Sequence, residues 1–193
     1  MNRFDLIIFD CDGVLIDSET LGSRALSEAM GTVGHDMSIP NVEATFSGAG
    51  EVETRALLNA KGLPADVIMK TAARKLSALF AQGVDPIEGI ESVLENQHVK
   101  ICVASNSSVA RLNDSLGRTP LAAFFGQHIY SANHVAVGKP APDLAFHCLE
   151  RMSTSAERAI FVDDNTHGVC CARDAGVLAI GFIGPSDHRP DHA

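Results

Sequence analysis

Five short apolar runs are the most regular feature of the chain, and each ends at a small or polar residue. They are rich in isoleucine, valine and phenylalanine, and continuous apolar runs of this length are typical of strands buried on both faces. The predicted strands are Leu6–Asp10, Ile101–Ser105, His128–Ser131, Ile160–Asp163 and Leu178–Ile183. Segments of helical length lie between the later strands, at Val109–Leu116, Pro142–Met152 and Gly168–Ala175. Strands that alternate with helices predict an α/β fold with a doubly wound parallel sheet.

The interval from Ser18 to Asp85 follows another pattern. It contains no convincing strand, and its apolar residues recur at helical spacing, as at Ala56, Leu57 and Ala60. The helices predicted here are Glu19–Met30, Glu51–Lys61 and Ala65–Gln82. The pattern therefore predicts a Rossmann-like core made of residues 1–17 and 86–193, with an all-helical domain of residues 18–85 inserted into it.

Composition narrows the class of protein. The 193 residues are 46% hydrophobic, as in ordinary globular proteins, and 15 Lys and Arg against 24 Asp and Glu give a net charge of −9. That charge argues against a nucleic-acid partner. Because no apolar run approaches the ~18 residues of a membrane helix and the N-terminus lacks a signal-peptide layout, we expect a cytoplasmic protein without a membrane partner. The five cysteines form no C-x-x-C pair and are expected to be reduced thiols. The sequence shows no evident exposed apolar stripe, and we therefore expect a monomer.

Acidic side chains follow two of the predicted strands. Asp10 and Asp12 end the first strand, just before Gly13, and Asp163 and Asp164 end the fourth. Parallel strands place their carboxyl ends at one edge, where two like charges ~4 Å apart repel by about 4 kcal/mol at an effective dielectric of about 20. Such a cluster needs a bound cation. All the candidate ligands for that cation are hard oxygens, which favours Mg²⁺ over zinc. Taken alone, the first acidic pair is equally compatible with a turn that caps a helix.

Polar groups that suit a phosphate follow the other strands. Ser105 and Asn106 begin a Ser-Asn-Ser-Ser stretch that offers hydroxyl, amide and backbone N–H groups beside a helix start. Lys139 lies in a loop stiffened by two prolines, where its ammonium group would neutralise a transferring phosphoryl group. Each feature also has an ordinary interpretation: the serines cap a helix, and the lysine is solvated surface.

Together, in this order, these elements resemble the haloacid dehalogenase superfamily over nearly the whole chain. Its pattern is Asp-x-Asp-Gly after the first strand, Ser or Thr after the second, Lys before a late helix and an acidic pair after the fourth strand. Phe-Asp-Cys-Asp-Gly-Val-Leu-Ile-Asp-Ser, at residues 9–18, is similar to the branch that contains β-phosphoglucomutase and many sugar-phosphate phosphatases. In that branch a helical cap is inserted where residues 18–85 lie here.

The resemblance implies a Mg²⁺-dependent phosphatase that acts on a small phosphorylated metabolite. Asp10, ionised with an ordinary pKa of ~3.9, would attack phosphorus and become an aspartyl phosphate. Asp12 would be the general acid for the leaving alkoxide and then the base for water. The implied metal ligands are Asp10, Asp12 through its backbone carbonyl, Asp163 and Asp164. The implied phosphate-binding residues are Ser105, Asn106 and Lys139.

Three alternatives stay open at this point. The first is a β-phosphoglucomutase-type mutase. The resemblance implies that the cap closes over the site and that the loop Phe46–Glu51 determines specificity. Glu51 stands near the position where the mutase has an arginine in this loop, which argues against the mutase. A receiver-type signalling domain shares the acidic pair and the lysine, but it lacks a helical insert. Because the chain ends soon after the last strand, a catalytically silent relative is the third alternative.

Overall fold

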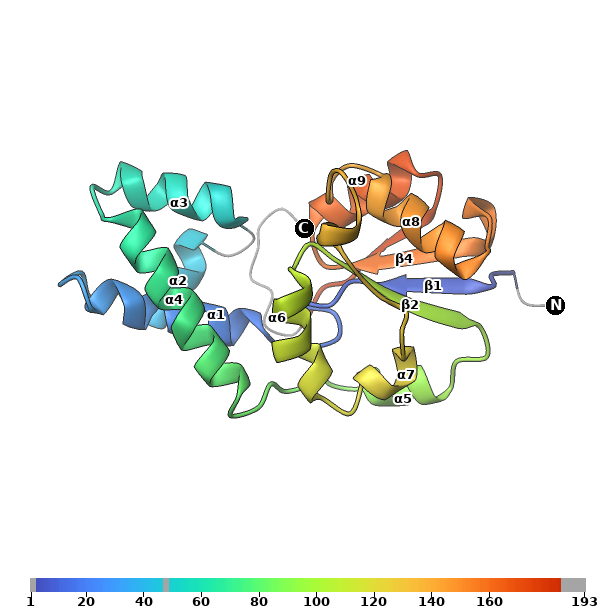
Figure 1. The fold of residues 1–193 in the computed structure, drawn as a ribbon, viewed down its shortest axis with the longest axis horizontal. Coiled ribbons are helices and arrows are strands. Elements are labelled where there is room, and N and C mark those ends of the chain that lie inside the picture. Colours follow the sequence, from blue (N-terminus) through green and yellow to red (C-terminus); the bar gives the residue numbers. More distant parts are fainter. Residues whose placement is uncertain (1–2, 47–48, 185–193) are drawn as a thin grey trace. The chain divides into compact units, whose positions relative to one another are not determined.

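A computed structural model describes residues 3–46 and 49–184 of the chain (Figure 1). The described residues divide into two compact units. One contains residues 3–17 and 84–184, and the other contains residues 18–46 and 49–83. The specificity loop expected at Phe46–Glu51 includes Ser47 and Gly48, which lie outside the described residues.

The first unit is built on a five-stranded sheet in which all neighbouring strands are parallel. Its strands are β1 (Leu6–Phe9), β2 (Lys100–Ser105), β3 (Ile129–Ser131), β4 (Ala159–Asp163) and β5 (Leu178–Gly181), in the order β3-β2-β1-β4-β5. Phe9 pairs with Val103 of β2 and Val162 of β4, so the residues that follow these three strands emerge at one edge. The predicted doubly wound α/β fold is confirmed, and β1 lies where the strand order reverses, which is where such sheets place their ligands.

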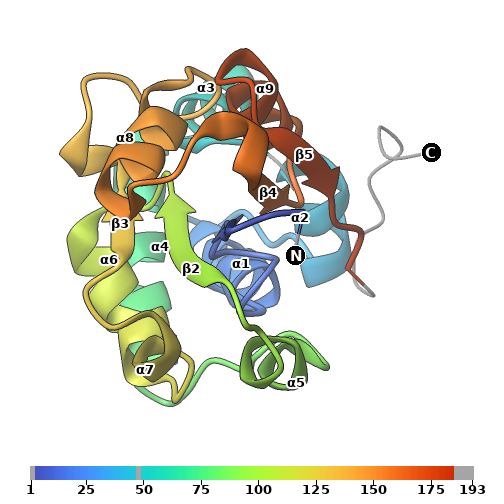
Figure 2. The same cartoon turned by 90° about the vertical axis from the view of Figure 1, so that its right-hand side faces the viewer.

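Helices pack on both faces of this sheet. They are α5 (Ile90–Glu95), α6 (Val109–Asp114), α7 (Ala122–Phe125), α8 (Asp143–Met152) and α9 (Thr166–Asp174), with 3-10 turns at Leu116–Arg118, Ala132–His134 and Ala156–Arg158. Figures 1 and 2 show α8 and α9 on one face and α5 and α7 on the other. The alternation of side chains along a strand therefore divides the apolar residues between two layers.

Strand β1 shows how both layers are filled. Leu6 and Ile8 are fully buried in a cluster with Leu144 of α8. Phe9 points the other way, and its ring meets the ring of Phe125 edge-on with centroids 6.2 Å apart. Burial of one such side chain stabilises the fold by about 1.5–3 kcal/mol. Strand β1 is thereby held on both faces, so the residues that follow it start from a fixed position.

The regular secondary structure in the described residues of the second unit is all helical. It consists of α1 (Glu19–Gly31), α2 (Ile39–Phe46), α3 (Glu51–Ala60) and α4 (Ala65–Phe80), and the insert of helices between β1 and β2 is confirmed. Its core includes Met30, Val42, Leu58 and Ile68. The apolar face expected on α3 is wrong in phase: Ala56 and Ala60 are exposed, whereas Thr54 and Leu58 are buried.

The chain leaves and re-enters the first unit through a small hydrogen-bonded frame. Ile16 bridges to Pro86, and the N–H of Asp17 donates to the carbonyl of Asp85 at 2.9 Å. The N–H of Ile87 donates to the carbonyl of Leu15, also at 2.9 Å. These bonds tie the end of the Asp10–Asp17 segment to the segment that leads into α5.

Four of the five cysteines are buried, and all five are free thiols. Among the described helices, none combines the length and the apolar character that crossing a membrane would require.

Candidate active site

Three carboxylates meet at the carboxyl edge of the sheet. Asp10 follows β1, Asp163 is the last residue of β4, and Asp164 follows it; each is buried, and an oxygen of each lies within 4.8 Å of the others. Gly13 has a φ of +82°, and a Cβ at this position would collide with the Asp164 carboxylate. A glycine is needed here both for the left-handed backbone and for this close approach. The sequence argument from strand ends thus located these three groups.

Lys139 lies at the centre of this cluster. Its Nζ donates to Asp10 Oδ1 at 2.6 Å, to Asp163 Oδ2 at 2.8 Å and to the carbonyl of Ala104 at 3.1 Å. Only 5% of the side chain is exposed. An ammonium group has three N–H donors, so these contacts occupy all of them. Lys139 is therefore a fixed charge within the site and not a solvated surface lysine.

The cluster shifts the pKa values of its members. Burial raises the pKa of Asp10 well above its ordinary value, Lys139 opposes that rise, and the carboxylates of Asp163 and Asp12 add to it. The expectation of an ordinary pKa for Asp10 is therefore wrong. Burial alone would lower the pKa of Lys139, but the Asp10 and Asp163 carboxylates raise it above its ordinary value. The lysine is a permanent cation at neutral pH.

Asn106 holds the segment that carries this lysine. Its Nδ2 donates to the carbonyl of Lys139, and its Oδ1 accepts from the N–H of Lys139, both at 2.8 Å. Ser105 is buried, and its Oγ accepts from the N–H of Ser107 at 3.0 Å. Both residues stand at the end of β2 beside the site. The side-chain amide of Asn106 positions the lysine, whereas contact of Ser105 or Asn106 with phosphate stays a prediction.

Asp12 lies outside the group of three carboxylates and has its own partners. Ser107 Oγ donates to Asp12 Oδ2 at 2.7 Å, and Arg111 Nη2 donates to Asp12 Oδ1 at 3.3 Å. The Asp12 side chain is 23% exposed, so solvent reaches it as it does not reach Asp10. The Ser-Asn-Ser-Ser stretch placed Ser107 near the site, but sequence reasoning missed its hydrogen bond to Asp12, and it missed Arg111 altogether. The acidic spacing alone could not identify these contacts, because Ser107 precedes α6 and Arg111 lies within it, nearly a hundred residues along the chain from Asp12.

The donor set fits a hard divalent cation. Three buried carboxyl groups carry up to three negative charges, and the single positive charge of Lys139 is shared between Asp10 and Asp163. Oxygen ligands are those that Mg²⁺ prefers, and one oxygen of each of the three groups lies within 4.8 Å of the others, so they could share one cation. A bound cation would also favour the ionised form of Asp10 and so oppose the effect of burial.

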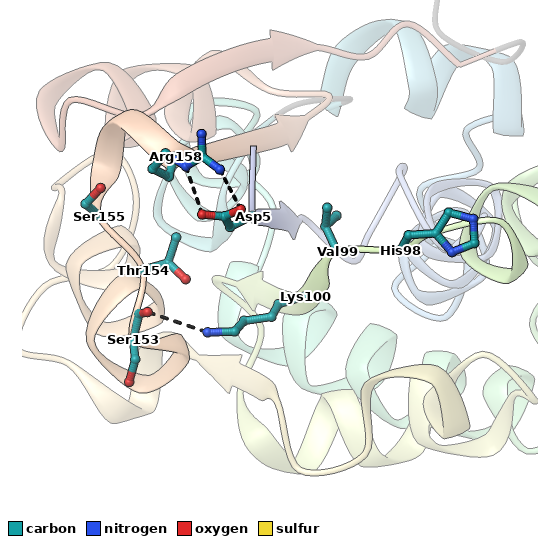
Figure 3. A pocket seen from close by; sticks show the side chains of 8 residues that line it. All are labelled: Asp5, His98, Val99, Lys100, Ser153, Thr154, Ser155 and Arg158. Atoms are coloured by element: carbon teal, nitrogen blue, oxygen red, sulfur yellow. Dashed lines mark hydrogen bonds and ion pairs between the residues drawn. The ribbon is translucent and has the colours of Figure 1, made fainter. Parts of the chain in front are cut away.

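A separate hollow lies at the opposite, amino edge of the sheet. It has a volume of about 410 Å³ and is lined by residues that precede β1 and β4 and begin β2 (Figure 3). Its two strongest cations are engaged within the protein: Arg158 forms a bidentate pair with Asp5, and Lys100 Nζ donates to the carbonyl of Met152 at 2.7 Å. These contacts connect the strand starts to α8 and the turn before β4. We therefore assign this hollow a structural role, and the reacting groups belong to the other edge.

The sheet order, the cap inserted after the first strand and the four strand-end elements define a class of protein. The chain belongs to the haloacid dehalogenase-like hydrolases, whose family model matches residues 7–182. Within this family it is a phosphoric monoester hydrolase, in agreement with the resemblance seen in the sequence.

Particular relatives narrow this class. The chain is 29% identical to 6-phosphogluconate phosphatase of Escherichia coli over 98% of its length and 87% of that protein. It is 25% identical to a fructose-1-phosphate phosphatase of the same organism, over 92% of this chain and 96% of that protein. Among solved structures, a haloacid dehalogenase-like protein of Agrobacterium tumefaciens superimposes with a TM-score of 0.84 at 34% identity, covering 95% of this chain and 84% of that one.

Proposed function

We propose that the protein is a Mg²⁺-dependent sugar-phosphate phosphatase that works through an aspartyl phosphate at Asp10. The observation that carries the proposal is the Lys139 ammonium held between Asp10 and Asp163 at the carboxyl edge of the sheet. A second carboxylate, Asp12, lies beside it with both oxygens in contact with donors. The names of the two curated relatives support a sugar phosphate as substrate.

Asp10 begins the reaction by attacking the phosphorus atom of the ester. The bond between phosphorus and the leaving oxygen breaks, and Asp12 gives that oxygen a proton, so that a neutral alcohol departs. In the second half Asp12 takes a proton from the water that attacks phosphorus, and the bond between phosphorus and Asp10 breaks. Inorganic phosphate leaves, the Asp10 carboxylate is regenerated, and Asp12 is protonated for the next cycle. Lys139 fixes the orientation of Asp10. Its ammonium group also places positive charge close to the phosphoryl oxygens, which carry the negative charge of the transition state.

Mg²⁺, held by Asp10, Asp164, the backbone carbonyl of Asp12 and Asp163, would supply the remaining positive charge beside the phosphoryl group. Asp163 has a second task, because its Oδ2 anchors Lys139 and its Oδ1 accepts from the N–H of Asn165 at 2.9 Å.

Turnover of an aryl phosphate with and without Mg²⁺, followed by a panel of sugar phosphates, tests the proposal. Asp10→Asn is expected to lower turnover by roughly 10³-fold or more because it removes the nucleophile with little change of shape. Asp174→Asn is the matched control, since Asp174 is exposed on α9 and paired with its neighbour Arg173. Lack of turnover on every ester by folded protein with Mg²⁺ would favour the catalytically silent alternative.

The mutase alternative is separated by the product. Release of one inorganic phosphate per sugar monophosphate consumed supports the phosphatase. Isomerisation that depends on a sugar bisphosphate, without net release of phosphate, supports the mutase.

A further inference from the structure

Arg111 is the site residue for which the proposed mechanism gives no task. It lies on α6, and its Nη2 is 3.3 Å from Asp12 Oδ1, while Ser107 holds the other oxygen of Asp12 at 2.7 Å. A contact of 3.3 Å is at the long end of hydrogen-bonding distances. Ser107 is thus the tighter partner of Asp12, and the arginine contact is the weaker of the two.

Arg111 also differs from Lys139 in accessibility. The Lys139 side chain is 5% exposed and donates to three oxygens of the protein. The Arg111 side chain is 40% exposed. A guanidinium group carries five N–H donors in a planar fork that matches a carboxylate or a phosphate. A molecule that enters the site can therefore reach Arg111, whereas Lys139 is enclosed by the protein.

The position of Arg111 relative to the reaction follows from its contact with Asp12. In the proposed mechanism, on which this inference rests, Asp12 contacts the leaving oxygen of the ester. Because Arg111 contacts Asp12 and is 40% exposed, this mechanism places it beside the organic part of the substrate and not beside the phosphoryl oxygens. We propose that Arg111 is a specificity-determining residue that selects phosphate monoesters whose alcohol part carries a second anionic group, a carboxylate in particular.

Two matched pairs of substrates test this inference. The first is 6-phosphogluconate against sorbitol 6-phosphate, and the second is 3-phosphoglycerate against glycerol 3-phosphate. Within each pair the molecules differ by a carboxylate in place of a CH₂OH group, and the two pairs place that carboxylate at different distances from phosphorus. For at least one pair, kcat/KM of the wild-type protein is expected to favour the carboxylate by about 10- to 100-fold, the size of one charge-assisted hydrogen bond.

Three variants assign the preference to its source. Arg111→Gln is expected to bring that ratio towards one, mainly through a higher KM for the carboxylate substrate, and Arg111→Lys should retain part of it. Arg118→Gln is the matched control, because Arg118 is half exposed and pairs with Asp114 one helical turn before it. It should leave the ratio unchanged. Thermal unfolding of each variant shows whether it is folded before rates are compared.

The outcomes separate the two proposals. Turnover of both members of each pair at equal efficiency by the wild type would overturn the role of Arg111 and leave the phosphatase standing. An equal fall for both members in Arg111→Gln would also overturn it, because Arg111 would then act on Asp12 alone. Absence of turnover on all four compounds and on an aryl phosphate is the result that removes the proposed function itself.

Discussion

Replacement of Lys139 by methionine tests the electrostatic account of the site. Its Nζ forms ion pairs of 2.6 Å with Asp10 and 2.8 Å with Asp163, and 5% of the side chain is exposed. Each pair has a gross attraction of about 6 kcal/mol at an effective dielectric of about 20. Desolvation of the ammonium group offsets much of this attraction, so the net loss on breaking a buried pair is about 3–5 kcal/mol. We expect the free energy of unfolding of Lys139→Met to fall by this amount.

Urea unfolding with a chelator present measures this loss without a contribution from metal. Lys70→Met is the control, because Lys70 is an exposed lysine on α4 and its replacement should change the free energy of unfolding by less than about 0.5 kcal/mol. Asp163→Asn in the Lys139→Met background removes one of the two stranded charges. The double variant is therefore expected to be more stable than Lys139→Met alone.

Magnesium gives an independent check on the same variant. Without the lysine, the buried carboxylates of Asp10, Asp163 and Asp164 keep one more uncompensated negative charge. Added Mg²⁺ should then raise the melting temperature of Lys139→Met by more than that of the wild type, since ligand binding to the folded state stabilises it. A loss below about 1 kcal/mol, together with equal responses to Mg²⁺, would refute the view that Lys139 neutralises this cluster.

Two further substitutions test the packing and the surface charge. A Cβ at Gly168 would overlap the Asp163 carboxylate, so Gly168→Ala should displace that group and lower both stability and turnover. At Gly22 of α1 nothing lies within 4 Å of an added Cβ, so Gly22→Ala should raise the free energy of unfolding in urea by about 0.5–1 kcal/mol. Arg158, by hydrogen bonding and by its charge, lowers the pKa of Asp5 below its ordinary 3.8. A carboxyl group whose pKa is lowered on folding stabilises the folded state at pH values above its pKa in the unfolded chain. Asp5→Asn should therefore be less stable than wild type at pH 7, and the difference should vanish by about pH 2. A difference that persists at that pH would contradict the ion pair.

The strands could be predicted because each is a short continuous apolar run. Strands β1 to β4 are largely buried, whereas β5 lies at the edge of the sheet and leaves Leu178 and Ile180 exposed. Helix starts were harder to predict. Helix α9 begins at Thr166, two residues before the predicted start, because Asn165 Oδ1 accepts from the N–H of His167 and caps it. The short helix α2, Ile39–Phe46, was not predicted, and only Val42 and Phe46 within it are buried. Eight residues with two core positions give too few repeats for a helical period to be recognised.

The apolar face of α3 was misplaced for a related reason. Its sequence offers Ala56, Leu57 and Ala60 as an apolar set, but the buried positions are Thr54 and Leu58. Exposure of an alanine side chain costs little free energy because the side chain is small. A threonine side chain can be buried when its hydroxyl group donates a hydrogen bond to an acceptor. Thr54 Oγ1 donates to the carbonyl of Ala49 at 3.4 Å. Hydrophobic pattern alone cannot reveal that bond, since it depends on where the preceding loop lies.

Within the site, residues fixed by strand ends were predictable and residues fixed by side-chain contacts were not. Asp10, Asp163 and Asp164 lie at or directly after the ends of strands β1 and β4, and topology alone brings parallel strand ends together. Ser107 and Arg111 belong to the site through hydrogen bonds to Asp12. Those bonds depend on rotamers and on the angle at which α6 leaves the sheet. A stretch of serines before a helix indicates a cap, and Ser108 is that cap, with its Oγ accepting from the N–H of Arg111.

The rigid and the accessible parts of the site lead to different consequences for mutation. Lys139 is held through its backbone by Asn106 and through its ammonium group by two carboxylates, and these contacts exist before any substrate binds. Such preorganised charge acts on the phosphoryl group that all substrates share, so changes there should weaken turnover of every ester and also destabilise the fold. Arg111 is partly exposed and contacts Asp12 at 3.3 Å, so changes there should alter which esters are preferred. A variant that shifts substrate preference without loss of stability is therefore expected on the side of Asp12 that Arg111 occupies, and not around Lys139.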